Sequence, residues 1–210
     1  MTTLAVLKQR IADEVARDDL TVQIAYAISD AVKHYQPSRF WFTESRSECV
    51  FSTVAAQEFY TSADEADIPN LLRIDQITLL DGTVKYELIR ADDREIEIFD
   101  SATSNRSRPS LFSYLGGQLR FYPIPDAVYT VRVAGITRLA VPSDDSGSNA
   151  WTNDAEELIR NRAKYLLYRD VIRDKGEAAV AKAAEMEALR RLEAETHART
   201  ATGTIAVWEF

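Results

Sequence analysis

Reactive and metal-binding residues are scarce in this sequence. It has one cysteine, Cys49, and two histidines, His34 and His197, among 210 residues. A single cysteine excludes a disulfide within the chain, and so few thiols and imidazoles cannot build a Cys/His metal site. We therefore expect no metal and no cofactor. The cysteine content suits a reducing compartment.

Glycine is also infrequent, and its spacing matches no nucleotide-binding pattern. The seven glycines form neither a phosphate-binding loop nor a dinucleotide motif, and no Gly-x-Ser-x-Gly sequence is present. Long apolar runs are absent, and no charged segment followed by an apolar stretch opens the chain. We expect neither a membrane span nor export, and production in the cytoplasm.

The charge balance is acidic. Asp and Glu number 33 against 25 Lys and Arg, which gives a formal net charge of -8. This sign disfavours a protein that binds by neutralising phosphates, so sequence-specific nucleic-acid binding is not expected. The length allows one well-buried core, or a helical layer and a β layer that share one.

Apolar periodicity predicts helices at both ends of the chain. Leu4, Leu7, Ile11 and Val15 recur at helical spacing, and a second helix ends at Pro37, with Asp18 and Asp19 as its candidate caps. After a Ser/Asp loop at 142–150, Asn153 and Glu156 resemble a capping box for a helix that ends at Gly176. An alanine-rich helix is then expected from Glu177 to about His197.

In the middle of the chain, apolar and polar residues alternate as they do in β-strands. A hairpin is predicted from Ile74–Leu80 and Thr83–Ile89, turning at Asp81-Gly82, and a second turns at Gly116-Gly117. A strand from Tyr129 to Ile136 follows, and 92–102 is a candidate short helix. The predicted fold is α+β: an N-terminal helical hairpin and two long C-terminal helices packed together, with an inserted antiparallel sheet that is sandwich-like or barrel-like.

The last ten residues carry the strongest functional indication. They leave an alanine-rich helix and become apolar and β-prone, with Ile205, Val207, Trp208 and Phe210 as the large side chains. Burying these four side chains would stabilise the segment by about as much free energy as ordering its ten residues costs. We therefore predict that this extended segment, 201–210, is a docking arm that orders on another chain. The predicted regions are 1–40, 41–141, 142–200 and this arm.

Candidate catalytic groups each have a structural explanation. Cys49 is expected to be a small buried hydrophobe rather than a nucleophile, and His34 and His197 to be helix-end residues. The acid pairs at 92–93, 144–145 and 156–157 could suggest hydrolase chemistry, but pairs are expected by chance in an acidic chain. Phe40-Trp41-Phe42 could face a core or a neighbour, and Arg106 and Arg108 could touch a phosphate or solvent. We predict no catalytic residue.

One segment resembles a known family. Residues Pro109 to Asp126, with Gly116-Gly117 and Pro123-Ile124-Pro125, followed by Tyr129-Thr130-Val131, resemble the head–tail adaptor proteins of tailed bacteriophages. The order of helical hairpin, β insertion, long helices and apolar tail is similar over nearly the whole chain.

The resemblance implies a structural virion protein at the head–tail junction. It implies a homo-oligomeric ring of twelve copies that binds the portal protein, offers a platform to a tail or nozzle protein, and lets DNA pass through its channel. Ile205, Val207, Trp208 and Phe210 are then the partner-binding residues. The acidic charge suits a channel in which DNA must slide. A peptidoglycan-cleaving hydrolase and another tail-completion module are the alternatives.

Overall fold

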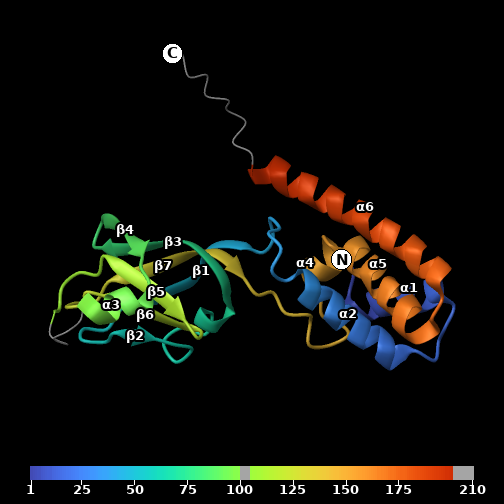
Figure 1. The fold of residues 1–210 in the computed structure, drawn as a ribbon, viewed down its shortest axis with the longest axis horizontal. Helices are drawn as coiled ribbons and strands as arrows, with labels where there is room; N and C mark the ends of the chain where they lie inside the picture. Colours follow the sequence, from blue (N-terminus) through green and yellow to red (C-terminus); the bar gives the residue numbers. More distant parts are fainter. Residues whose placement is uncertain (100–104, 201–210) are drawn as a thin grey trace, which may run out of the picture. The chain divides into compact units, whose positions relative to one another are not determined.

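The computed structural model describes residues 1–99 and 105–200, and it divides the chain into two compact units. A helical unit combines residues 1–42 with the C-terminal part from Leu139 onward, and a β unit consists of Thr43–Arg138. Figure 1 shows the elements of both units. The chain is therefore α+β, as the sequence predicted, with the β-rich segment inserted between two helical segments.

Two amphipathic helices open the helical unit. Helix α1 spans Leu4–Val15, and the Thr3 side chain accepts a hydrogen bond from Val6 N at its start. Helix α2 spans Thr21–Tyr35 and ends just before Pro37. The prediction that Asp18 and Asp19 cap α2 is wrong, because its N-cap is Leu20 and makes no side-chain bond. Asp19 instead accepts hydrogen bonds from Arg17 at 2.7 and 2.8 Å.

The first helix after the Ser/Asp loop begins about one turn earlier than predicted. Helix α4 spans Ala150–Asn153, and its capping box joins Asn149 to Thr152. The predicted box at Asn153 is therefore wrong, since Asn153 ends α4 and its side chain accepts from Thr2 N at 2.7 Å. Helix α5 spans Glu156–Leu166 and continues as a π-helical segment, η2, over Leu167–Ile172.

The last helix, α6, spans Lys175–Thr200. Gly176 lies inside its first turn and does not end the helix before it, contrary to the prediction. The reversal is made by Arg173, which has a φ of 62°, and Asp174 caps α6 by accepting from Gly176 N and Glu177 N at 2.9 and 3.1 Å. Asp174 was the usable sequence signal, because Asp is a preferred N-cap residue.

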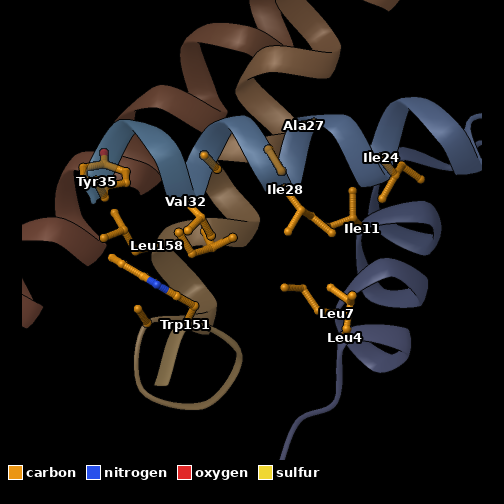
Figure 2. Close-up of a cluster of buried hydrophobic side chains, with 14 of the residues drawn as sticks. Leu4, Leu7, Ile11, Ile24, Ala27, Ile28, Val32, Tyr35, Trp151 and Leu158 are labelled. Atoms are coloured by element: carbon orange, nitrogen blue, oxygen red, sulfur yellow. The ribbon is translucent and has the colours of Figure 1, made fainter. Parts of the chain in front are cut away.

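The helical core lies between α1, α2, α4 and α5, as Figure 2 shows for its labelled residues. Leu7, Ile11, Ile28 and Trp151 are almost fully buried. Trp151 packs edge-to-face against Phe40 and Phe42, and its Nε1 donates to Leu139 O at 2.8 Å. One large aromatic residue thereby ties the short α4 to the chain segment that follows α2.

The described part of the β unit forms one curled seven-stranded sheet in the order β1-β7-β3-β4-β5-β6-β2. Its pairs are antiparallel apart from a short parallel contact between β4 and β5. A 3₁₀ turn, η1 (Ile68–Asn70), precedes β3, and a short helix, α3 (Asp93–Phe99), follows β4. The strand bounds are β1 Glu44–Ser52, β2 Phe59–Tyr60, β3 Leu71–Asp81, β4 Val84–Arg90, β5 Leu111–Leu115, β6 Gln118–Tyr122 and β7 Thr130–Thr137.

Both predicted hairpins are present. Gly116 and Gly117 have φ angles of 60° and 78°, which is the left-handed pair that a two-residue turn between β5 and β6 requires. In the other hairpin Asp81 pairs with Val84, so the turn residues are Gly82 and Thr83 rather than Asp81 and Gly82. The sheet encloses a core that includes Cys49, Tyr60, Phe121 and Val131.

Candidate functional site

The single thiol of the sequence is buried in the β unit. Cys49 lies on β1 with no exposed surface. Burial, followed by the nearby charges of Glu65 and Asp67, raises the pKa of its thiol to about 12. The thiol therefore stays protonated near neutral pH, which agrees with its interpretation as a small buried hydrophobe.

The two histidines occupy the last turns of α2 and α6. The His34 ring meets Tyr35 edge-to-face with centroids 4.8 Å apart. Partial burial, together with the positive charge of Arg162, lowers its pKa from the ordinary value of 6.5. Both positions fit the helix-end role expected from the sequence.

The adjacent acids have separate structural partners. Asp92 accepts from Arg94 N at 2.9 Å, which starts α3, while Asp93 accepts from Ser113 Oγ at 2.8 Å. Asp145 pairs with Lys8 at 2.6 Å. The two adjacent acids of α5, Glu156 and Glu157, also contact different residues.

In that pair, Glu156 lies 3.4 Å from both Arg10 and Arg160, and Glu157 lies 3.2 Å from Arg191. Within the described ranges, no group of three His, Cys, Asp or Glu side chains could hold a metal ion. Among those same residues, no helix combines the length and apolarity needed to cross a bilayer.

The arginines of the predicted Ser/Asn loop are placed in the β unit. The Arg108 guanidinium lies 3.6 Å from the centre of the Tyr86 ring, a cation–π contact. Arg106 forms an isolated backbone bridge with Ile124. Arg108 therefore has a structural partner of its own, on β4.

A buried carboxylate, Glu185, lies where α6 meets α2 and α5. It has no exposed surface, and its Oε1 accepts from Tyr35 Oη at 2.5 Å, Lys182 Nζ at 2.9 Å and Arg162 Nη1 at 3.3 Å. Burial and then the hydrogen bond to Glu185 raise the pKa of Tyr35. This cluster joins α6 to α2 and α5.

The β unit contains the opposite arrangement around Arg120, whose side chain is 5% exposed. Its guanidinium contacts Glu58 at 2.5 Å, Glu97 at 2.8 Å and Asp93 at 3.4 Å. Burial alone would lower its pKa, but the hydrogen bonds to these three carboxylates raise it. The cluster joins β6 to α3 and to the residue that precedes β2.

Sequence reasoning did not single out Glu185 or Arg120. The signal for Glu185 was its position in the inward-facing series of α6, between Ala181 and Ala188. Arg120 lies between Leu119 and Phe121 on β6, and both of these neighbouring residues are fully buried. A charge at a core position needs a partner, which makes both positions recognisable.

The C-terminal end of α6 is fixed against the aromatic run at 40–42. The Arg199 guanidinium lies 3.8 Å from the centre of the Trp41 ring, and Trp41 N donates to Thr196 Oγ1 at 3.4 Å. Phe40 is buried in the core, and Trp41 and Phe42 are partly exposed. The aromatic run therefore includes both a core position and rim positions within the helical unit.

The predicted partner-binding residues lie outside the described residues. Ile205, Val207, Trp208 and Phe210 all belong to 201–210, directly after α6. Their attachment point is described, because α6 reaches Thr200 and Arg199 is held on Trp41.

A family model matches nearly the whole chain. The family model described as SU10 adaptor protein matches residues 2–207, which include both units. No curated protein matches the chain.

Proposed function

The chain belongs to the SU10 adaptor protein family, and from this membership we propose that it is a structural subunit of a bacteriophage virion that joins the portal to the tail. The observation that carries the proposal is the family match, which extends over residues 2–207. An adaptor acts by holding surfaces together, so its working parts are faces and arms rather than a catalytic centre.

We propose further that the subunit acts in a ring at the head–tail junction, through which DNA passes. The resemblance noted in the sequence implies twelve copies, with the portal on one side and a tail or nozzle protein on the other. The net charge of -8 supports this role, because an acidic channel does not retain DNA.

The docking arm is the proposed contact with the portal or a neighbouring subunit. Four large apolar side chains, Ile205, Val207, Trp208 and Phe210, lie within six residues at the end of the chain. The arm starts from a fixed point, because the cation–π contact of Arg199 with Trp41 holds the end of α6. Ten extended residues reach at most about 35 Å from that point.

Truncation after Arg199 tests the arm. We expect the truncated protein to keep the thermal unfolding of the full chain and to lose binding to purified portal rings in sedimentation. A double variant, Trp208→Ala with Phe210→Ala, keeps the length and should lose most of the binding. Unchanged portal affinity of the truncated protein would contradict the arm.

Electron microscopy tests the larger proposal. The protein mixed with portal rings should add a ring of density to one face of the portal. If the portal stays bare and the protein instead joins isolated tails, the tail-completion alternative is correct. Clearing of a peptidoglycan gel by the purified protein would favour the hydrolase alternative.

A further inference from the structure

Helix α6 differs from the other long helices because apolar residues lie on two opposite sides of it. In α1 and α2 the buried residues gather on one side, as in an ordinary surface helix. In α6 the apolar residues are spread almost evenly around the axis. One face is covered within the helical unit, and the opposite face is open to solvent.

The inner face of α6 packs on α5 and η2 and is only shallowly apolar. Its buried residues follow helical spacing: Ala178, Ala181, Glu185, Ala188, Leu192 and Thr196. At 100° per residue, the positions opposite this series include Val180, Ala183, Ala194 and Ala198. All four are exposed, and Val180 is 64% exposed. A helix with apolar residues on opposite faces is typical of one buried between neighbours.

Helix α2 offers a second open face. Val22 and Tyr26 are 58% and 69% exposed, and Asp30 and Lys33 continue the same side towards the C-terminus. Asp30 and Lys33 form a weak pair at 3.4 Å, with side chains more than half exposed. This pair can therefore accept further charged partners.

The two open faces lie on different sides of the same unit. Helix α5 packs against both α2 and α6, and Figure 1 shows α6 along the upper side of the helical unit and α2 along its lower side. The two faces therefore do not cover each other within one chain. Two different faces on one subunit are what a head-to-tail contact needs, and such contacts form a ring when the rotation between subunits closes.

The faces match when the helices run antiparallel. Along α6 the outward residues Glu187, Arg190, Ala194 and Ala198 are separated by three, four and four positions. Along α2, read backwards, Lys33, Asp30, Tyr26 and Val22 have the same separations. Glu187 then opposes Lys33, and Arg190 opposes Asp30. The large side chains Tyr26 and Val22 oppose two alanines.

Charge and shape are therefore complementary along the whole match. Arg190 is exposed and has no ion-pair partner among residues 1–99 and 105–200, whereas Glu187 also pairs with Arg191 at 2.5 Å. Alanines allow the axes to approach to about 8 Å, where the Tyr26 ring can fill the space between turns. We propose that the outward face of α6 in one subunit packs antiparallel on α2 of a second copy, and that this is the contact that closes the ring.

This inference rests on the proposed ring, and disulfide trapping tests it separately. Tyr26→Cys protein is mixed with Ala194→Cys protein and oxidised, and the products are separated without reductant. We expect a cross-linked dimer in the mixture. A single chain with both substitutions should give a ladder of products, as head-to-tail contacts require. The native Cys49 is fully buried and should not contribute.

The matched control is Tyr26→Cys mixed with Ala179→Cys. Ala179 is also an exposed alanine of α6, but it lies fifteen residues, about 22 Å, from Ala194. The proposed register predicts little product from this mixture. Equal product in the two mixtures would overturn the register.

Charge exchange supplies an independent readout. Arg190→Glu should weaken self-association about fivefold, the equivalent of about 1 kcal/mol, and adding Asp30→Arg should restore it. Molecular mass is measured on the same samples with and without portal. Rings without the Tyr26–Ala194 product would overturn this inference alone. A protein that stays monomeric even with portal would overturn both this inference and the proposed function.

Discussion

Among the residues that the structure describes, each unit buries one charged side chain, and the two charges have opposite signs. In the helical unit Glu185 receives hydrogen bonds from a tyrosine, an arginine and a lysine, whereas in the β unit Arg120 faces three carboxylates. In both units the cluster joins elements that are far apart in the sequence. It joins α6 to α2 and α5 in the helical unit, and it joins β6 to α3 and to the residue before β2 in the β unit.

The units also differ in how the chain builds them. The β unit is continuous from 43 to 138, whereas the helical unit needs both 1–42 and the C-terminal helices. A continuous segment with its own core can fold without the rest of the chain. We therefore expect damage to the helical unit to leave the β unit folded.

Replacing Trp151 with alanine should have the largest effect. The indole is 1% exposed and contacts Phe40 and Phe42, so its loss should cost the helical unit about 3–5 kcal/mol. Circular dichroism should show loss of helix at lower denaturant concentration. The Cys49 thiol reports on the β unit, and it should stay unreactive towards a thiol reagent while the helices unfold. Simultaneous exposure of Cys49 would show that the units unfold together.

Arg120→Met should have the next largest effect, and on the other unit. The change leaves Glu58, Asp93 and Glu97 without their common partner, although these carboxylates are partly exposed, so we expect a loss of about 2–4 kcal/mol. Cys49 should then react faster with the thiol reagent, while the helical signal keeps its midpoint. An unchanged Cys49 rate would mean that the cluster contributes nothing to the stability of the sheet.

Much of the fold was predictable because local patterns agree with the packing. The spacing of Leu4, Leu7 and Ile11 predicts the buried face of α1, and Gly116-Gly117 predicts a turn that needs two positive φ angles. Helix boundaries were less predictable. Two adjacent capping patterns, at Asn149 and Asn153, compete in the sequence, and tertiary contacts decide that Asn153 binds Thr2 instead.

The buried charges and the second face of α6 were not predictable to the same degree. Sequence spacing shows that Glu185 is in line with Ala181 and Ala188, but only the structure supplies Tyr35 and Arg162 from other helices. The shallow alanine surface of α6 was visible in the sequence. Which of its sides stays open depends on where α5 lies, which no local pattern specifies.

Glu185→Gln should have a smaller effect, confined to one helix. Glutamine keeps an acceptor for Tyr35 but removes the charge that Arg162 and Lys182 face, so we expect a loss of about 1–2 kcal/mol. Hydrogen exchange should accelerate in α6 more than in α1 or α2. If the clusters serve the roles compared above, the same measurement on Arg120→Met should show faster exchange in β2 and α3 instead. Uniform acceleration across the helical unit would mean that Glu185 supports the whole core rather than the attachment of α6.

Gly117→Ala should have the smallest effect, and it tests whether the glycine pair is only structural. The added Cβ would lie 3.9 Å from Pro69, an ordinary contact, so the cost is the backbone strain of a positive φ, about 1 kcal/mol. Asparagine at Gly116 is the matched control, because Asn-Gly suits the same turn and should cost less. Cys49 should become slightly more reactive in Gly117→Ala, and the stability of the helical unit should not change.

Portal binding of Gly117→Ala should also be unchanged, because the hairpin sets the geometry of β5 and β6 and the proposed contacts belong to α2, α6 and the arm. Loss of portal binding without loss of stability would assign the Gly116-Gly117 turn to an interface and extend the contact surface into the β unit.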